Sequence, residues 1–109
     1  MRYGMVIGLH PDKVEEYKRL HADVWPGVLK TLTENGVRDF TIFLKEPENL
    51  LFGVFDYVGD DDYSEAARRI AADPVTQEWW KVTEPCQKPL EHRRPGEWWG
   101  FMENVFHLD

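Results

Sequence analysis

Apolar residues recur at three- and four-residue intervals through the first third of the chain. The stripe contains Val14, Tyr17, His21, Val24, Trp25, Val28 and Leu32. This spacing places all of them on one face of a helix and predicts a surface that packs against the core. His21 carries a titratable ring into that stripe, and this costs solvation energy unless the ring meets a partner or a bound molecule.

Proline and glycine mark where this helical region begins, breaks and ends. Pro11 is typical of a helix start, and we expect a first helix to run to about position 23. Pro26 cannot lie in a smooth helix because its ring removes a backbone hydrogen bond. The helix should therefore kink or restart at Trp25–Pro26. The second helical piece should end at Asn35–Gly36, which favours a left-handed stop.

Three apolar segments have the length and composition of strands. Tyr3–Leu9 and Leu50–Tyr57 are strongly apolar, and Val37–Lys45 alternates between polar and apolar residues. A turn-rich segment joins the last two, which predicts an antiparallel hairpin. We expect a polar, proline-rich loop over 85–96 and a final strand over Trp98–Leu108.

Two more helices are predicted in the second half of the chain, over 63–72 and over 75–84, separated by Asp73–Pro74 as cap and restart. The resulting order is β-α-β-β-α-β, so we predict one α+β, ferredoxin-like domain over 1–109 with an antiparallel sheet.

Leu50–Phe55 is apolar on both faces of that sheet, although the helices cover only one. A second copy of the chain would cover the other face, which predicts a homodimer packed sheet to sheet.

The charge balance narrows the classes of partner. The 109 residues include 20 acidic and 13 basic ones, a net charge of -7. Lys and Arg do not gather on one face, so we expect neither nucleic acid nor an anionic membrane as partner. A neutral ligand fits this balance better. Five tryptophans and six phenylalanines are numerous for so small a core and predict an aromatic cleft or subunit contact.

Cysteine usage and hydropathy bear on the cellular compartment. Cys86 is the only cysteine, so no disulfide can form within the chain and no CxxC site exists. No apolar run approaches the ~20 residues that span a bilayer. The N-terminus enters a strand directly, without a signal-peptide pattern. We therefore expect a cytoplasmic protein.

The candidate chemistry centres on His21 and Tyr17, which lie one helical turn apart, so that their polar tips can reach the same volume. A hydrogen-bonded core histidine is the structural alternative for His21, as plain packing is for Trp79 and Trp80. The four histidines show no metal-ligand spacing, and no hydrolase or nucleotide-binding motif occurs. One histidine, phenols and indoles can bind the apolar face of a neutral ring and move protons around it.

Several stretches in a fixed order cover nearly the whole chain and carry a family resemblance. They are Glu16–His21 with Val24–Pro26, Thr41–Leu44, Asn49–Phe52, Gln77–Lys81 and Met102–Leu108. Together they resemble the L-rhamnose mutarotases. The Tyr-x₃-His-x₃-Trp-Pro and Trp-Trp-Lys signatures are fairly specific as a pair, whereas either alone would be weak.

The resemblance implies a dimeric ferredoxin-like domain of the dimeric α/β-barrel type, which works without a cofactor or metal on a small neutral monosaccharide. It implies exchange of the α and β anomers of L-rhamnose, or of a related 6-deoxy or pyranose sugar, by acid/base ring opening and closure. The family's proton donor falls on His21. Its sugar-contacting tyrosine falls on Tyr17 and its paired tryptophans on Trp79 and Trp80. A second substrate-contacting tyrosine of the family is replaced here by Phe40.

Two features depart from the family pattern and keep other functions open. Phe40 lacks a phenolic hydroxyl, and the segment over 88–99 is longer than usual, so both bear on which sugar is preferred. A cofactor-free monooxygenase would use a similar dimeric domain with a more apolar cleft. A sugar-binding module without catalysis is the other alternative.

Overall fold

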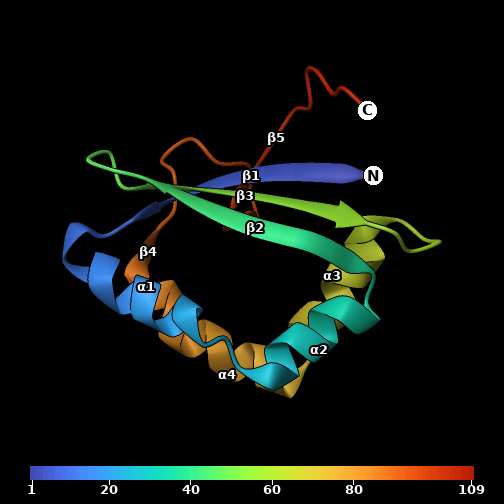
Figure 1. Cartoon of the computed structure of the whole chain (residues 1–109), viewed down its shortest axis with the longest axis horizontal. Coiled ribbons are helices and arrows are strands. Elements are labelled where there is room, and N and C mark those ends of the chain that lie inside the picture. The colour runs from blue at the N-terminus through green and yellow to red at the C-terminus, as the bar shows by residue number, and fades with distance from the viewer.

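Helices cover only one face of the sheet, while the C-terminal tail rises from the other (Figure 1). The computed structural model describes residues 1–109. Its elements are β1 (Arg2–Leu9), a 3₁₀ turn (Pro11–Lys13), α1 (Val14–Ala22), α2 (Pro26–Glu34), β2 (Val37–Lys45), β3 (Leu50–Tyr57), α3 (Tyr63–Ala72), α4 (Pro74–Thr83), a second 3₁₀ turn (Glu84–Cys86), β4 (Gln87–Lys88) and β5 (Gly100–Met102). None of the helices is long and apolar enough to cross a membrane.

The sheet is antiparallel, with strand order β2-β3-β1-β4, and β5 also pairs with β1. The short strands β4 and β5 share one edge of β1, β4 beside Gly8–Leu9 and β5 beside Gly4–Val6. This arrangement confirms the predicted α+β, ferredoxin-like fold and its hairpin.

Local sequence signals explain the helix boundaries. Trp25 is extended and Pro26 opens α2, which confirms the predicted restart. Gly36 follows α2 with a φ of 84°, the left-handed conformation that glycine adopts without strain. The Asp73 carboxylate accepts hydrogen bonds from Thr76 N at 2.8 Å and Thr76 Oγ1 at 2.9 Å, which caps α4.

The core lies between the helices and alternate residues of β1 and β3. Burial alternates strictly along β3, with one set of side chains facing the helices and the other half-buried on the uncovered face. One buried cluster consists of Ile7, Leu9, Val14, Tyr17, Leu51 and Cys86. A second consists of Met5, Val37, Phe55 and Ile70.

A β-bulge in β2 lets both Val37 and Phe40 face the helices. Between Arg38 and Thr41 the register against β3 shifts, so that two residues of β2 oppose Phe55 alone. Asp39 takes up this insertion with a φ of 51°. The Phe40 ring lies 5.6 Å from the Phe55 ring, centroid to centroid, on the same face of β2 as Ile42 and Leu44.

The last segment differs from the prediction. The expected strand over Trp98–Leu108 is wrong in length, because only Gly100–Met102 finds backbone to pair with. Positions 103–109 have no neighbouring strand within this chain. The expected loop over 85–96 instead contains β4, whose pairing with β1 gives no signal in the local sequence.

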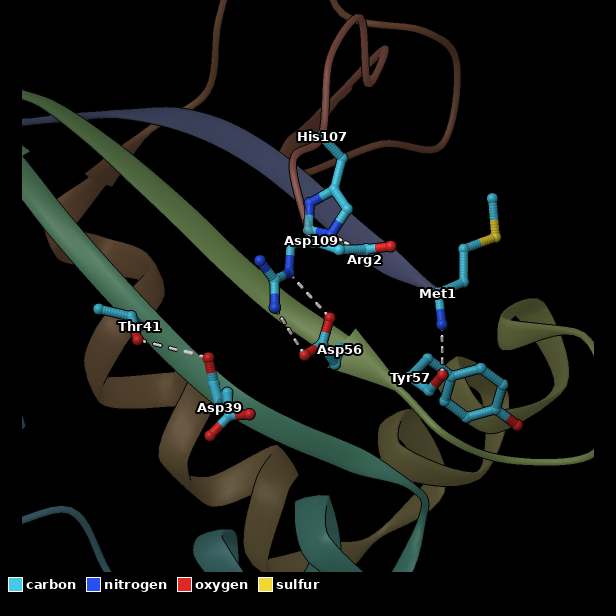
Figure 2. Close-up of polar contacts among 8 residues, drawn as sticks. All are labelled: Met1, Arg2, Asp39, Thr41, Asp56, Tyr57, His107 and Asp109. Atoms are coloured by element: carbon cyan, nitrogen blue, oxygen red, sulfur yellow. Dashed lines mark hydrogen bonds and ion pairs between the residues drawn. The ribbon is translucent and has the colours of Figure 1, made fainter.

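Polar contacts tie the N-terminus of the chain to β3. Figure 2 shows the Arg2 guanidinium on Asp56, with Nε to Oδ1 at 2.9 Å and Nη2 to Oδ2 at 3.0 Å. The Met1 ammonium group donates to the Tyr57 carbonyl oxygen at 2.9 Å. In the tail, His107 Nε2 pairs with Asp109 at 3.1 Å (Figure 2).

The fully buried Ile7 should report the stability of the core. We expect Ile7→Ala to lower the free energy of unfolding by about 2–5 kcal/mol and Ile7→Val by about 1 kcal/mol, because each leaves a cavity in the β1–β3 core. Urea titration followed by tryptophan fluorescence measures both. Val58→Ala, at a 57% exposed position, is the control and should change stability by less than about 0.5 kcal/mol.

Candidate active site

His21 and Tyr17 stack against each other on α1. The ring centroids are 4.1 Å apart with planes 24° from parallel. His21 Nδ1 lies 2.9 Å from the Tyr17 backbone carbonyl oxygen. Tyr17 is buried in the core, whereas His21 is half-buried. The helical spacing that suggested a common volume therefore does bring the two rings together.

The hydrogen bond to the carbonyl decides which nitrogen of His21 is available. A carbonyl oxygen can only accept, so Nδ1 must carry the hydrogen and Nε2 carries the lone pair of the neutral ring. No other group of the chain bonds to His21. Burial lowers the pKa of His21 below its ordinary value of 6.5, and the Tyr17 carbonyl opposes this only in part. At neutral pH the site therefore presents an uncharged proton acceptor.

Two tryptophans extend this aromatic group. The buried Trp79 of α4 meets His21 edge-on, with centroids 5.3 Å apart. Trp25, which the sequence did not single out as a site residue, meets Trp79 at 5.1 Å. Its role could have been suspected from the apolar stripe, where it lies one turn after His21. Trp79 therefore covers one side of the imidazole, and Trp25 packs against Trp79.

The other two predicted site residues lie on a neighbouring surface. Trp80 packs against the Met5–Phe55 cluster, and Phe40 contacts Phe55. Successive residues of α4 point about 100° apart, which directs Trp79 to His21 and Trp80 to the sheet. The structure brings Tyr17, His21 and Trp79 into direct ring contact, but neither Trp80 nor Phe40 touches His21.

A small cavity opens beside the His21–Tyr17 pair. Its volume is about 140 Å³, and its lining is Tyr17, Lys18, His21, Ile42, Leu44 and Leu51. Clefts for drug-sized ligands are larger, ~300–1,000 Å³, so this one admits only a small molecule. The Lys18 ammonium group lies 3.7 Å from Glu15 and 4.0 Å from Glu46, near the surface.

The Tyr17 hydroxyl has a partner that the sequence did not reveal. Gln87 Nε2 lies 3.3 Å from Tyr17 Oη, and Gln87 Oε1 lies 2.7 Å from Trp98 Nε1. Burial raises the pKa of Tyr17 to about 12, while the bond to Gln87 opposes the rise. The phenol therefore stays protonated at physiological pH. Contacts across 70 residues, such as this one, leave no periodic signal in the sequence.

Other groups of the molecule lack this combination of cavity and titratable ring. A wider hollow of about 470 Å³ lies near the start of β2, lined by polar residues such as Arg38, Asp61 and Arg69. Its charges bond one another, with Arg69 Nη1 2.9 Å from Asp61. No three His, Cys, Asp or Glu side chains gather as a metal site. Burial and Glu16 raise the pKa of the Cys86 thiol to about 11, so it remains protonated.

Comparison with known proteins fits this geometry. The family model of L-rhamnose mutarotase matches residues 2–108. The chain belongs to the L-rhamnose mutarotase family. As a member, it is an isomerase acting on a carbohydrate. An L-rhamnose mutarotase of Bacillus subtilis (strain 168) is 33% identical over 108 residues, which cover 99% of this chain and 98% of the relative.

Solved structures share the fold at lower identity. An L-rhamnose mutarotase from Formosa agariphila superposes with a TM-score of 0.78 at 23% identity, covering 100% of this chain and 99% of that one. Tetracenomycin F2 cyclase from Streptomyces glaucescens, a type-II polyketide cyclase, gives 0.70 at 19% identity over 100% and 99%. A dimeric ferredoxin-like protein from an uncultured marine organism gives 0.55 at 14% over 99% and 91%. These likenesses establish the fold alone.

The lowered pKa of His21 should appear directly in a titration. Following its ring resonances by NMR, with His21→Gln for assignment, should give a pKa below 6.5. Because the unfolded chain then binds this proton at higher pH than the folded one, the contribution of His21 to stability is full above about pH 6.5. It decreases as the pH falls toward the folded-state pKa, and His21→Gln should remove that decrease. A folded-state pKa above 6.5 would contradict the desolvated site.

Proposed function

We propose that this protein exchanges the α and β anomers of L-rhamnose or a closely related pyranose, with His21 as the proton-transfer group. The observation that carries the proposal is the free Nε2 of a neutral, half-buried imidazole on the wall of a small cavity. The family, whose model covers residues 2–108, supports the sugar.

Anomer exchange opens the pyranose to an aldehyde and recloses it on the other face of the carbonyl. The anomeric hydroxyl must lose a proton, and the ring oxygen must gain one as its bond to the anomeric carbon breaks. Both oxygens are bonded to the same carbon, so one nitrogen can serve both. His21 Nε2 accepts the hydroxyl proton and delivers it to the ring oxygen, and reclosure reverses these transfers. No redox change occurs, and the reaction needs no co-reactant.

The surrounding residues have simpler roles in this proposal. The Tyr17 hydroxyl orients the sugar by a hydrogen bond, and Trp79, which packs edge-on against His21, excludes water from the imidazole. Trp80 lies outside the cavity lining and would pack on the carbon face of a sugar ring that extends beyond the cavity. Phe40, which lies on the same side of the sheet, adds apolar surface where a hydroxyl would otherwise bind the sugar. This loss should relax the preference among sugars that differ at one hydroxyl.

The two alternatives are separable by one set of measurements. Saturation-transfer NMR on L-rhamnose, L-fucose, L-lyxose and D-mannose detects accelerated anomer exchange and ranks the sugars. Oxygen uptake with a quinol would instead indicate the monooxygenase. A sugar that raises the melting temperature without faster exchange would indicate a binding module. The family membership favours the first outcome.

Replacing the proton-transfer group is the direct test. His21→Gln should slow the catalysed anomer exchange by roughly 10²–10⁴-fold, the usual contribution of one placed acid/base group. Saturation-transfer NMR gives the rate, and circular dichroism checks the fold. His92→Gln, the same change in the exposed loop, should keep the wild-type rate. Near-normal exchange in folded His21→Gln protein would refute the assignment.

We also propose that the uncovered face of the sheet is the contact between two copies of the chain. Adjacent strands line up Phe43, Phe52 and Val6 in a row across this face. Phe43 is 60% exposed in the single chain. The tail carries Val105, Phe106 and Leu108, each at least 79% exposed. A contiguous apolar surface of this kind marks an interaction site, and its chemistry suits another copy of the same face.

Charge placed in this row should separate the copies. We expect wild-type protein to sediment as a dimer in analytical ultracentrifugation and Phe43→Asp to sediment as a monomer, because an unpaired carboxylate is costly to bury. Leu29→Asp introduces the same charge at an exposed position of α2 and should leave the dimer intact. A monomeric wild-type protein at micromolar concentration would contradict the proposed contact.

A further inference from the structure

Gln87 is a buried polar residue that the mechanism above does not use. Its side chain is 6% exposed and lies at the start of β4, where Gln87 pairs with Leu9. The amide meets two partners, Trp98 Nε1 at 2.7 Å and Tyr17 Oη at 3.3 Å. A buried amide with both ends bonded is fixed in orientation, which a loosely packed glutamine would not be.

The indole determines which end of the amide faces which partner. Trp98 Nε1–H can only donate, so it must meet the amide oxygen. The NH₂ group of Gln87 must then face Tyr17 and donate to the phenol oxygen. The usual ambiguity between oxygen and nitrogen in a glutamine side chain is thereby removed.

The direction of the hydrogen bond from Gln87 to Tyr17 also determines where the phenol hydrogen can point. Because Tyr17 Oη accepts from Gln87, its own hydrogen points elsewhere. No acceptor within the chain takes that hydrogen, since the bond to Gln87 is the only one that the hydroxyl makes. The hydroxyl is therefore held as an unused donor on a residue that lines the cavity together with His21.

We propose that Gln87, locked by Trp98, is a positioning residue that keeps the Tyr17 hydroxyl as a hydrogen-bond donor to the bound sugar. This role rests on the proposed function. The donor would bind an oxygen of the neutral sugar, and it would compensate in part for the hydroxyl that Phe40 lacks.

The backbone supports this placement at two points. A Cβ atom on Gly8 would lie 2.6 Å from the Lys88 carbonyl oxygen, so β4 can approach β1 only because position 8 is glycine. Trp98 comes from the long loop between β4 and β5, and its bond ties that loop to the site. The loop is longer than is usual in the family, and through Trp98 it holds the Gln87 side chain in place.

A positioning role and a structural role predict different kinetics. The His21 ring is held by the Tyr17 backbone carbonyl and ring, so damage to the Tyr17 backbone would misplace the proton-transfer group and lower kcat. Loss of the hydroxyl donor alone removes one hydrogen bond to the bound sugar. That loss raises KM and leaves kcat nearly unchanged, because ground state and transition state share the contact.

The test replaces the NH₂ donor that faces Tyr17 with an acceptor. Gln87→Glu keeps the length and the acceptor for Trp98 but offers Tyr17 a carboxylate oxygen, which captures the phenol hydrogen. Saturation-transfer NMR over a range of L-rhamnose concentrations should show KM raised about tenfold, and about threefold to tenfold for Gln87→Met. In a Tyr17→Phe background neither change should alter KM by more than about twofold. Gln77→Glu, at an exposed position of α4, is the matched charge control.

Trp98→Phe tests the same interaction from the half-exposed loop and decides the question if the substitutions at position 87 do not fold. It should raise KM in the wild-type background and have no effect beside Tyr17→Phe. An unchanged KM, a loss confined to kcat, or an equal effect with and without the Tyr17 hydroxyl would overturn the role of Gln87. Wild-type protein that leaves anomer exchange at the buffer rate would instead overturn the proposed function itself.

Discussion

The arrangement of the site depends on the contacts that Tyr17 makes with the core, with His21 and with Gln87. Its ring fills the core beside Ile7, which joins α1 to the centre of the sheet. Its backbone carbonyl holds His21 Nδ1, and its hydroxyl meets Gln87. One residue therefore fixes the helix against the sheet through its ring, the tautomer of the imidazole through its backbone carbonyl, and the contact with β4 through its hydroxyl. A site held by several independent contacts keeps its geometry without a bound ligand.

The parts of this site that follow from local physics were predictable from the sequence. A period of 3.6 residues places Tyr17 and His21 on one face, and the restart at Pro26 follows from a missing backbone donor. Gln87 was not predictable, since its partners lie 70 and 11 residues away. The bulge that lets both Val37 and Phe40 face the helices was not predictable either, because one inserted residue in a pairing register leaves no mark on local composition.

The overestimated final strand has a physical cause that also concerns the uncovered face. Residues of the tail favour strand conformation, but a strand exists only where another backbone offers hydrogen bonds. Within one chain that pairing ends at Met102. The same chain leaves Phe43 and Phe52 without cover, because all helices lie on the opposite side (Figure 1). The unpaired tail and the uncovered phenylalanines are both features that contact with a second copy of the chain would explain.

The frame of helices and sheet does not select the reaction, since a polyketide cyclase shares it with a TM-score of 0.70. Selection must come from the polarity of the cavity. Here the imidazole is neutral because burial lowers its pKa, and the phenol is neutral because burial raises its pKa. The proposed proton transfer creates an imidazolium ion in a place that disfavours charge. Such an ion returns its proton readily to either sugar oxygen, and a reaction that must run equally well in both directions requires this.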